Sequence, residues 1–341
     1  MDQIQIVSWL LTRRCNLRCS YCRISRDYKA PPEYNSMKYF HQLEMKTEDI
    51  LETLRRLKLH NPNVFHIFYG GEPTLRTDLS EIIGYCHKEY INYTIISNMT
   101  DRPKEVIDNL IKEHGFLQGL TASIDPIIME EYSNEDRWRK TWGGYSLRKY
   151  RGKVKDLVAE ITVSNDNLKN LYSLVRKLTD DGINSDITFV DIAKSPYYDF
   201  SNVTDDDLLV YKSAELRDII NRIIGEKLDV HMRDILLPAI YDILPSELDC
   251  KIEDDVHNIT IDADGSIRLC LRICGIITPG SFRTSNFLDE NGKIHESLKD
   301  VLGQDKKRLC QKCNWTCQIM SSLLSKNDGN IESLLHSERR L

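Results

Sequence analysis

Strand-like and helix-like segments alternate over residues 4–195, and this alternation constrains the fold more than any other feature of the chain. Apolar runs of strand length, such as Ile4–Leu11 and Val64–Tyr69, are separated by segments with helical spacing of apolar residues. Such alternation predicts βαβ units and a parallel sheet. The expected strands are 4–11, 64–69, 93–97, 120–124, 157–163 and 187–190, and the expected helices begin near Thr47 or cover 79–90, 103–114 and 168–178.

Six strand–helix units predict an α/β fold of the partial (β/α)6 TIM-like barrel type, open at one side for a large substrate. In α/β barrels the active site lies at the C-terminal ends of the strands. After Ser195 the pattern changes to a long amphipathic helix over 205–228, followed by a hairpin over 259–273 that turns at Asp264-Gly265. We expect a barrel at 1–200, a helical connection at 201–240, a small hairpin-containing module at 241–320 and a tail at 321–341.

Cysteine usage indicates metal binding. The 341-residue chain has 10 cysteines and a net charge of −6, with no apolar run of membrane-spanning length and no signal-peptide pattern at its start. These features predict a cytoplasmic protein without membrane association. Disulfides are disfavoured in a reducing compartment, so clustered cysteines there indicate metal ligands. Cys86 stands apart from the clusters in an expected helix, and we interpret it as a buried structural thiol.

The first cluster, Cys15, Cys19 and Cys22, follows the first expected strand with the spacing C-x3-C-x2-C. Three thiolates on one tight loop can bind three irons of a [4Fe–4S] cubane, which leaves the fourth iron open to a substrate. Structural zinc is the alternative, but such sites usually have four ligands, often in C-x2-C pairs. No fourth Cys or His is close in the sequence.

This loop resembles that of the radical S-adenosylmethionine (SAM) superfamily, in which an aromatic residue such as Tyr21 usually precedes the third cysteine. The resemblance implies that SAM chelates the open iron. It also implies that an electron from a reductant such as flavodoxin or ferredoxin cleaves SAM, yielding a 5′-deoxyadenosyl radical that abstracts hydrogen from a substrate. The cofactor then supplies the chemistry, and the protein supplies position and exclusion of water.

Gly70-Gly71-Glu72-Pro73 ends the second expected strand and looks like the GGEP motif of this superfamily, which binds the SAM amino group. Paired glycines let a ligand approach the backbone closely. The carboxylate of Glu72 and nearby carbonyl groups can hold an ammonium group. An ordinary turn is the alternative for this motif taken by itself.

Polar residues also end the third and fourth expected strands. The resemblance assigns SAM contacts to Ser123 and Asp125, and more loosely to Ser97 and Asn98. A hydroxyl or carboxylate at such a position can hydrogen-bond a ribose, as acidic residues do in dinucleotide folds. Helix capping after a strand is the alternative for Ser123 and Asp125.

The C-terminal cysteines resemble the SPASM/twitch extension of the superfamily, in which a cysteine, a G-x4-C hairpin and a C-x2-C pair bind auxiliary clusters. The proposed ligands of one auxiliary [4Fe–4S] cluster are Cys250, Cys270, Cys310 and Cys313. A second cluster would need one iron left open, and a four-cysteine zinc site is the alternative. Cys274 and Cys317 are left over as ligands, buried thiols or catalytic hydrogen-atom donors.

The substrate is less constrained than the cofactors. SPASM and twitch extensions often occur in maturases of ribosomally made peptides, which favours epimerisation, crosslinking or another C–H modification of a peptide. A dehydrogenase or isomerase of a small polar metabolite, such as an aminocyclitol or sugar, is the second hypothesis. Nucleotide or nucleic-acid modification is the third; the basic, aromatic segment 137–155 favours it, and the acidic net charge opposes it. An electron carrier or a zinc-binding module would not need the GGEP motif.

Overall fold

A parallel sheet forms the centre of the molecule. The computed structural model describes residues 4–17, 19, 22, 44–124, 147–165, 167–189, 213–231, 258–268, 282–298 and 300–302. Its first six strands are β1 (Ile6–Leu10), β2 (Phe65–Tyr69), β3 (Asn92–Ser97), β4 (Leu117–Ser123), β5 (Val154–Val163) and β6 (Asn184–Phe189). Each pairs in parallel with the next one along the chain. The α/β class and the parallel sheet predicted from the sequence are confirmed.

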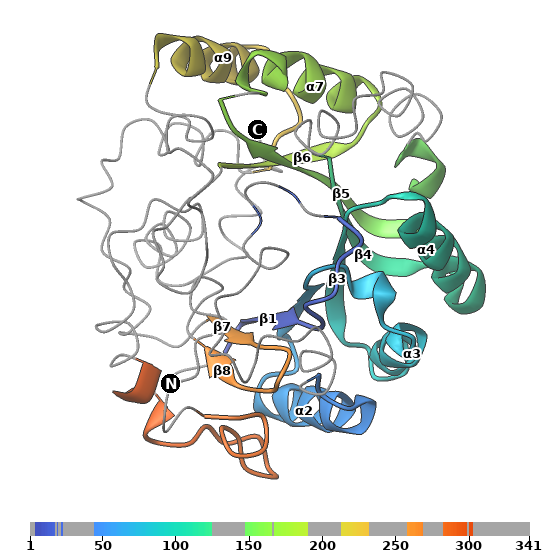
Figure 1. Ribbon diagram of the computed structural model, residues 1–341, viewed down its shortest axis with the longest axis vertical. Helices are drawn as coiled ribbons and strands as arrows, with labels where there is room; N and C mark the ends of the chain where they lie inside the picture. Colours follow the sequence, from blue (N-terminus) through green and yellow to red (C-terminus); the bar gives the residue numbers. More distant parts are fainter. Residues whose placement is uncertain are drawn as a thin grey trace.

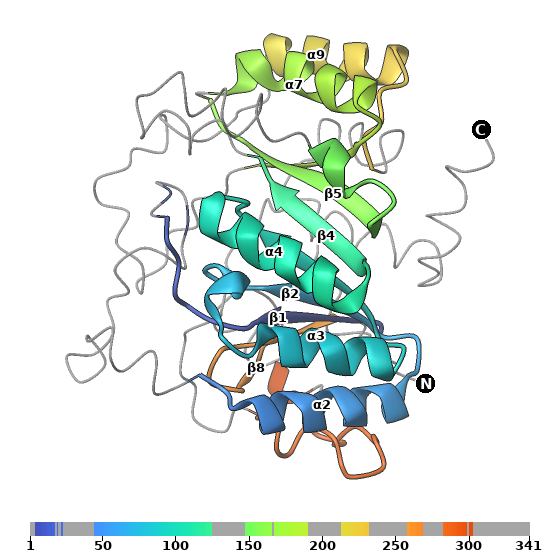
Figure 2. The same cartoon turned by 90° about the vertical axis from the view of Figure 1, so that its right-hand side faces the viewer.

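In the described part of the chain, five helices lie on the outer side of the curved sheet (Figures 1 and 2). They are α2 (Thr47–His60), α3 (Leu79–Lys88), α4 (Asp101–His114), α7 (Leu168–Asp180) and α9 (Ala214–Gly225), and two short 3-10 turns are η2 (Pro73–Leu75) and η4 (Leu147–Tyr150). Helices on one face of a parallel sheet are what successive right-handed crossovers produce. The carboxyl ends of the six strands therefore meet along one edge of the sheet, where the motifs of the sequence come together.

The helix ends follow from local chemistry, with two corrections. The helix expected over 205–228 is α9, which begins at Ala214 after its N-cap Ser213 and ends at Gly225. Gly115 ends α4 with φ 83°, and its N–H donates to the Ile111 carbonyl at 2.8 Å, as expected for a C-terminal glycine. Thr47, however, is not the N-cap of α2 as the sequence suggested. It is the first helical residue, and its hydroxyl donates to Asp78 Oδ2 at 2.6 Å. The hydroxyl thus ties α2 to the start of α3 instead of capping its own helix.

A hairpin from the C-terminal half continues the same sheet. β7 (Asn258–Ile261) pairs in parallel with β1 on the side away from β2, and β8 (Ile267–Arg268) pairs antiparallel with β7. The described strands therefore run in the order β6-β5-β4-β3-β2-β1-β7-β8. The turn at Gly265, with φ 83°, confirms the predicted hairpin. The module boundaries at 241 and 320 stay predictions, but β7 lies against the barrel's first strand and β8 lies against β7.

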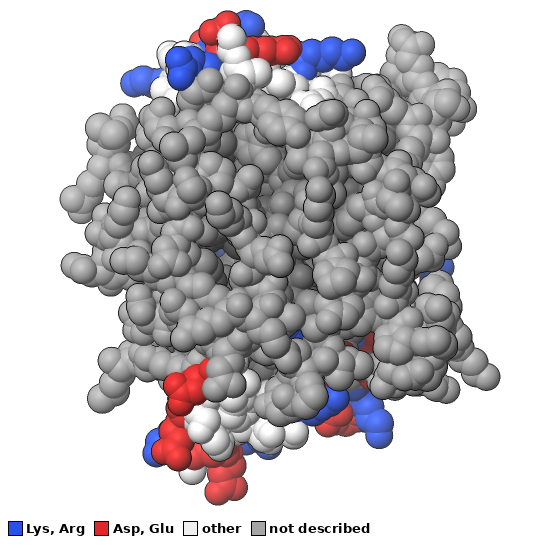
Figure 3. Space-filling view, turned by 60° about the vertical axis from the view of Figure 1, so that its left-hand side comes forward, with Lys and Arg blue, Asp and Glu red and all other residues white. Residues whose placement is uncertain are grey.

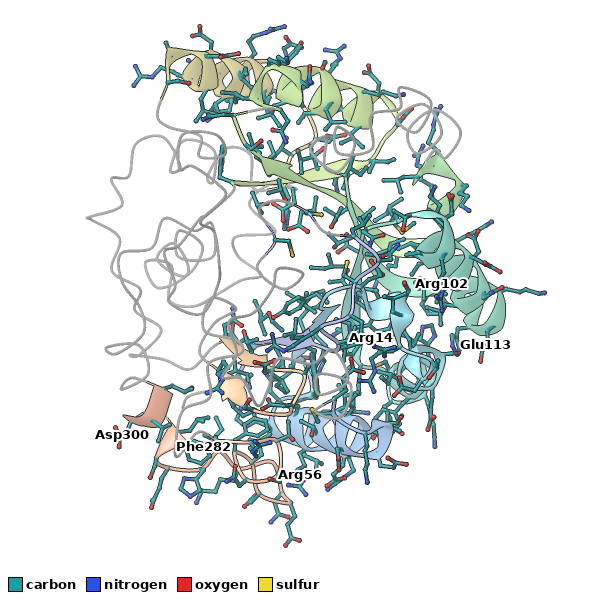
Figure 4. The ribbon with its side chains drawn as sticks, viewed as in Figure 1. Arg14, Arg56, Arg102, Glu113, Phe282 and Asp300 are labelled. Carbon is teal, nitrogen blue, oxygen red and sulfur yellow. The ribbon has the colours of Figure 1, made fainter. Side chains whose placement is uncertain are left out.

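Contacts from α2 also hold the segment that follows this hairpin. Arg56 on α2 donates to the Leu288 carbonyl at 3.4 Å, and Figure 4 shows it on the side of α2 nearest that segment. The ring of His60 lies between Ile4 N and the Gly292 carbonyl, at 3.0 Å from each. The C-terminal end of α2 therefore joins the start of β1 to a segment more than 200 residues later in the chain.

A buried Trp–His pair lies in the core between the sheet and its helices. Trp9 on β1 donates its indole N–H to His66 Nδ1 on β2 at 3.0 Å. Both side chains are almost completely buried, at 1% exposure. Burial lowers the pKa of His66 to about 3, so the ring stays neutral and its Nδ1 atom accepts.

We expect this pair to make the fold sensitive to mild acid. The unfolded chain binds a proton at His66 below about pH 6.5, whereas the native ring resists protonation until about pH 3. The stability that neutral His66 contributes is therefore present above pH 6.5 and is lost as the pH falls. Between pH 7 and pH 5 the loss from this one group is about 2 kcal/mol. Urea unfolding at the two pH values measures it.

The variant His66→Gln keeps an acceptor for Trp9 but cannot titrate, so its free energy of unfolding should change less between pH 7 and pH 5 than that of the parent protein. His295→Gln is the matched control because His295 is exposed. An unchanged pH dependence in His66→Gln would mean that another group causes the acid sensitivity.

The described surface shows no single-sign field on the face seen in Figure 3. Lys and Arg side chains there are mixed with Asp and Glu side chains at both ends of the view. In the described part of the chain, no helix is both long enough and apolar enough to span a bilayer.

Candidate functional site

The three N-terminal cysteines lie on a loop that starts where β1 ends. Cys15, Cys19 and Cys22 are half-buried thiols, and the Cys22 N–H donates to the Cys19 carbonyl at 3.0 Å. Among the described residues, no three His, Cys, Asp or Glu side chains gather closely enough to hold one metal ion. In a cubane cluster each thiolate would bind a separate iron.

The surroundings of Cys15 fit a metal-bound thiolate. The Leu17 N–H lies 3.4 Å from Cys15 Sγ, and Asn98 Nδ2 lies 3.9 Å from it. The pKa of Cys15 is raised to about 11, mainly by burial; the nearby Cys22 and Glu72 also act to raise it, whereas the two N–H donors act to lower it. A free thiolate is therefore unstable here, and bound iron would supply the positive charge that holds the sulfur deprotonated. The donor set thus fits an iron–sulfur cluster.

Gly70 and Gly71 pack directly against the backbone that leads into the cysteine loop. The Gly71 N–H donates to the Thr12 carbonyl, and the Glu72 N–H donates to the Arg14 carbonyl, both at 2.7 Å. A Cβ atom on Gly70 would overlap the Thr12 carbonyl oxygen, and one on Gly71 would overlap the Arg14 carbonyl oxygen. The sequence suggested that these glycines admit a ligand. In the structure the close neighbour is the chain's own cysteine loop.

Glu72 joins the ends of β2 and β3. It is completely buried, and its Oε1 atom accepts from the Ser97 hydroxyl at 3.0 Å and the Thr74 hydroxyl at 2.8 Å. Its Oε2 atom accepts from the Asn98 N–H at 2.8 Å. Burial raises the pKa of Glu72, and the donors of Asn98, Thr74 and Ser97 act against that rise. Pro73 begins η2 beside this carboxylate, so the whole GGEP motif is held rigidly.

Charged residues fix the base of the cysteine loop. Arg14 pairs with Glu44 at 3.0 Å, and the same carboxylate accepts from the Thr12 hydroxyl. Arg76, which is buried, donates to the Leu11 carbonyl at 2.9 Å and pairs with Asp78 at 2.6 Å. The path of the loop after β1 is therefore fixed, because its backbone carbonyl groups accept hydrogen bonds and its side chains form ion pairs.

A further ion pair ties the same loop to the C-terminal hairpin. Arg13 pairs with Asp262, which follows β7 and is 2% exposed. Local sequence patterns gave no sign of this pairing, because the two residues are 249 positions apart.

The inner face of the sheet carries titratable residues that the motif analysis missed. Strand register places Ser123 beside Glu160 on β5, and Glu160 beside Asp186 on β6. Val230 bridges Ser185, which brings His231 next to Asp186. Burial raises the pKa of Asp186, and the charge of His231 opposes the rise. The available signal was one acidic residue in each strand region: Glu160 within the otherwise apolar segment 157–163, and Asp186 directly before the apolar segment 187–190.

Several predicted site residues lie outside the described part of the chain, and their roles stay predictions. They are Tyr21, Asp125, Cys250, Cys270, Cys274, Cys310, Cys313 and Cys317. Of the others, the structure brings Cys15, Glu72, Ser97 and Asn98 together. Ser123 lies at the end of β4, two strands from β2 in the same sheet. The isolated thiol Cys86 is fully buried in α3, as predicted.

Comparison with known families and proteins gives one family and a set of distant relatives. The model of the Radical SAM superfamily matches residues 9–188, which is more than half of the chain. Fe-coproporphyrin III synthase of Methanosarcina barkeri is 32% identical over 127 residues, covering 37% of this chain and 28% of that protein. The radical SAM cyclopropyl synthase TigE of Paramaledivibacter caminithermalis is 26% identical over 236 residues, covering 65% of this chain and 46% of that protein. The chain thus spans less than half the length of both relatives.

Among solved structures, Streptococcus suis SuiB bound to S-adenosylmethionine superimposes with a TM-score of 0.59 at 14% sequence identity. The match covers 88% of this chain and 68% of SuiB. At this level of identity, the likeness establishes the shared fold.

Proposed function

Because the chain belongs to the radical SAM superfamily, we propose that it cleaves SAM reductively and modifies a C–H bond of a peptide. The reaction class would be that of a peptide maturase, by epimerisation, crosslinking or another C–H modification. When bound, the [4Fe–4S] cluster and SAM would supply an electron and a 5′-deoxyadenosyl radical, which removes hydrogen from the substrate. An external reductant such as flavodoxin or ferredoxin would provide the electron.

One observation carries the SAM-dependent part of this proposal: the ends of β1, β2 and β3 are bonded into one unit around Cys15. Backbone hydrogen bonds join residues 71 and 72 to residues 12 and 14. Glu72 joins the ends of β2 and β3, and Asn98 extends from β3 to the cysteine sulfur. A zinc-binding loop would not need the end of β3 or a buried carboxylate beside its thiolates.

Each residue of this unit has a defined task in the proposal. Cys15, Cys19 and Cys22 would hold the cluster, and the rigid turn at Gly70-Gly71 would present carbonyl groups to the amino group of SAM. Glu72 fixes that turn through its hydrogen bonds to Thr74, Ser97 and Asn98. Ser123, at the carboxyl end of β4, would contact the ribose, together with Asp125. Such preorganisation lets the site bind SAM with little rearrangement.

Fewer observations support a peptide as the substrate. A solved structure of Streptococcus suis SuiB, whose fold this chain shares, contains that enzyme's precursor peptide SuiA. The inner face of β4–β6 offers the hydroxyl of Ser123 and the carboxylates of Glu160 and Asp186, and His231 lies beside Asp186. These groups suit the hydrogen-bonding groups of a peptide. Fe-coproporphyrin III synthase, one of the relatives, favours a small-molecule substrate as the second candidate. Sugars, aminocyclitols and nucleotides belong to that class.

The C-terminal cysteines complete the proposal. Cys250, Cys270, Cys310 and Cys313 would bind an auxiliary [4Fe–4S] cluster within 241–320, after a barrel at 1–200 and a connection at 201–240. The hairpin that leads to Cys270 pairs with β1, which would place an auxiliary cluster close to the first strand of the barrel. Cys274 and Cys317 are the proposed hydrogen-atom donors.

Anaerobic reconstitution with iron and sulfide tests the cofactor assignment. About eight irons per chain and formation of 5′-deoxyadenosine from SAM under dithionite support it. Bound zinc without SAM cleavage contradicts it. To test the substrate, the reduced enzyme is incubated with SAM and the short peptides encoded beside its gene. A mass change in a peptide supports a maturase, whereas turnover of a tetrapyrrole or sugar alone supports the second candidate.

Cys313→Ala should distinguish the role of the auxiliary cluster from that of the N-terminal cluster. We expect this variant to cleave SAM at the parent rate, because the N-terminal site is intact, but to lose most product formation and about four irons per chain. Iron analysis and product quantification measure the two effects side by side. Full product yield with unchanged iron would remove any auxiliary role for Cys313.

A further inference from the structure

Asn98 is held so that its amide nitrogen faces the cysteine loop. Its backbone N–H donates to Glu72 Oε2 at 2.8 Å, and its Oδ1 atom accepts from Thr100 N at 3.1 Å and Thr100 Oγ1 at 2.8 Å. A backbone N–H can only donate, so the atom beside Thr100 N must be the amide oxygen. The NH2 group is therefore the one that faces Asn16 Oδ1 at 2.8 Å and Cys15 Sγ at 3.9 Å.

Cys15 Sγ thus has two N–H donors of different kinds. The Leu17 N–H, at 3.4 Å, belongs to the backbone and is present whatever side chain stands there. The donor of Asn98 is a side chain, and a substitution can remove it without breaking its backbone bond to Glu72. Hydrogen bonds to the sulfurs are among the factors that set the reduction potential of an iron–sulfur cluster.

We propose that Asn98 raises the reduction potential of the cluster bound at Cys15, by donating an N–H to the ligating sulfur. The proposal rests on the proposed function, since it needs the cluster at Cys15, Cys19 and Cys22. The step concerned is the gain of one electron from an external reductant, with no proton transferred and no bond broken. The added electron makes the sulfur ligands more negative, and an N–H donor stabilises that state more than the oxidised one.

The position of Glu72 increases the importance of the Asn98 N–H donor for reduction of the cluster. A buried carboxylate beside the cluster disfavours any further negative charge, and Glu72 is near enough to affect Cys15 electrostatically. Asn98 contacts both groups, with its backbone on Glu72 and its side chain on Cys15. The side-chain donor therefore offsets the carboxylate at the sulfur where the electron density increases.

Asn98→Asp is the sharpest test because it keeps the shape and the acceptor for Thr100 while replacing the NH2 donor by an oxygen. Potentials are measured on the anaerobically reconstituted protein by EPR-monitored titration with dithionite, with and without SAM. We expect the midpoint to become more negative in Asn98→Asp. In Asn98→Ala, which loses the donor without gaining a charge, the shift should have the same sign and a smaller size.

Asn16→Asp is the matched control. It adds a carboxylate one residue from Cys15, but Asn16 is exposed and does not donate to the sulfur. Water and salt screen an exposed charge, so we expect a smaller shift than in Asn98→Asp. Equal shifts in the two Asp variants would show a general charge effect and overturn the proposal.

The remaining outcomes separate this inference from the proposed function. A cluster that forms in all variants with one unchanged potential overturns the role of Asn98 and leaves the SAM assignment standing. Absence of any iron–sulfur signal in the parent protein overturns the proposed function itself. If Asn98→Asp does not hold its cluster, the midpoint potential of Asn98→Ala provides the test. A potential equal to that of the parent protein would then overturn the proposal.

Discussion

Cys19→Ala is expected to abolish SAM cleavage. Cys19 stands in the middle of the C-x3-C-x2-C loop, and its carbonyl accepts the Cys22 N–H at 3.0 Å. Removing its thiol leaves two ligands for a cubane, and a cluster held by two cysteines should not persist. The measurement is 5′-deoxyadenosine formed under dithionite, together with iron content. We expect no product above background and a loss of about four irons per chain.

Cys86→Ala provides the matched control because it removes a thiol that the fold buries away from the loop. Cys86 lies in α3 with no exposed surface. The change should lower the free energy of unfolding by about 1–2 kcal/mol through lost packing, with iron content and SAM cleavage unchanged. Full activity in Cys19→Ala, or equal loss in both variants, would refute the assignment of the N-terminal cysteines as cluster ligands.

Gly71→Ala should also cause a large loss of cluster content and SAM cleavage, although it changes no ligand of the cluster. A Cβ atom at this position would overlap the carbonyl oxygen of Arg14, which is backbone and cannot rotate away. The end of β2 would have to separate from the cysteine loop and lose the hydrogen bonds to Thr12 and Arg14. Such overpacking costs about 1–3 kcal/mol. We expect cluster content and SAM cleavage to fall at least tenfold.

Gly225→Ala is the comparison for this substitution. Gly225 ends α9, and a Cβ atom there would meet no neighbour within 4 Å. An alanine should be neutral or stabilise the helix by up to about 1 kcal/mol, without affecting cluster content. If Gly71→Ala retains its cluster and cleaves SAM at the parent rate, Gly71 does not have the packing role that the geometry assigns to it.

Local patterns of sequence were enough to predict the elements and the main motifs. Apolar periodicity placed the six parallel strands and most helices, because burial of one face imposes a fixed repeat on the residues nearby. The C-x3-C-x2-C spacing predicted the cysteine loop after β1, and Gly115 predicted the end of α4. Two helix starts were predicted wrongly. The Thr47 hydroxyl, which could cap its own helix, bonds to Asp78 instead, and α9 begins at Ala214 after its N-cap Ser213 and not at residue 205.

Tertiary structure alone decided what these motifs contact. The sequence indicated that Gly70 and Gly71 allow a close approach, but which group approaches depends on how β1 and β2 are aligned. The same holds for Glu72, whose partners Ser97 and Asn98 lie at the end of another strand. Strand register, and hence these pairings, comes from packing over the whole sheet and leaves no local signature.

The position of the C-terminal hairpin shows most clearly what the sequence alone does not predict. The sequence by itself determined that residues near 259–268 form a hairpin, because Asp-Gly turns and alternating apolar residues are local features. Only the tertiary structure placed β7 beside β1 and paired Arg13 with Asp262. Contacts between residues so far apart in the chain depend on which sheet edge is left free once the other strands have paired, and no local pattern records that.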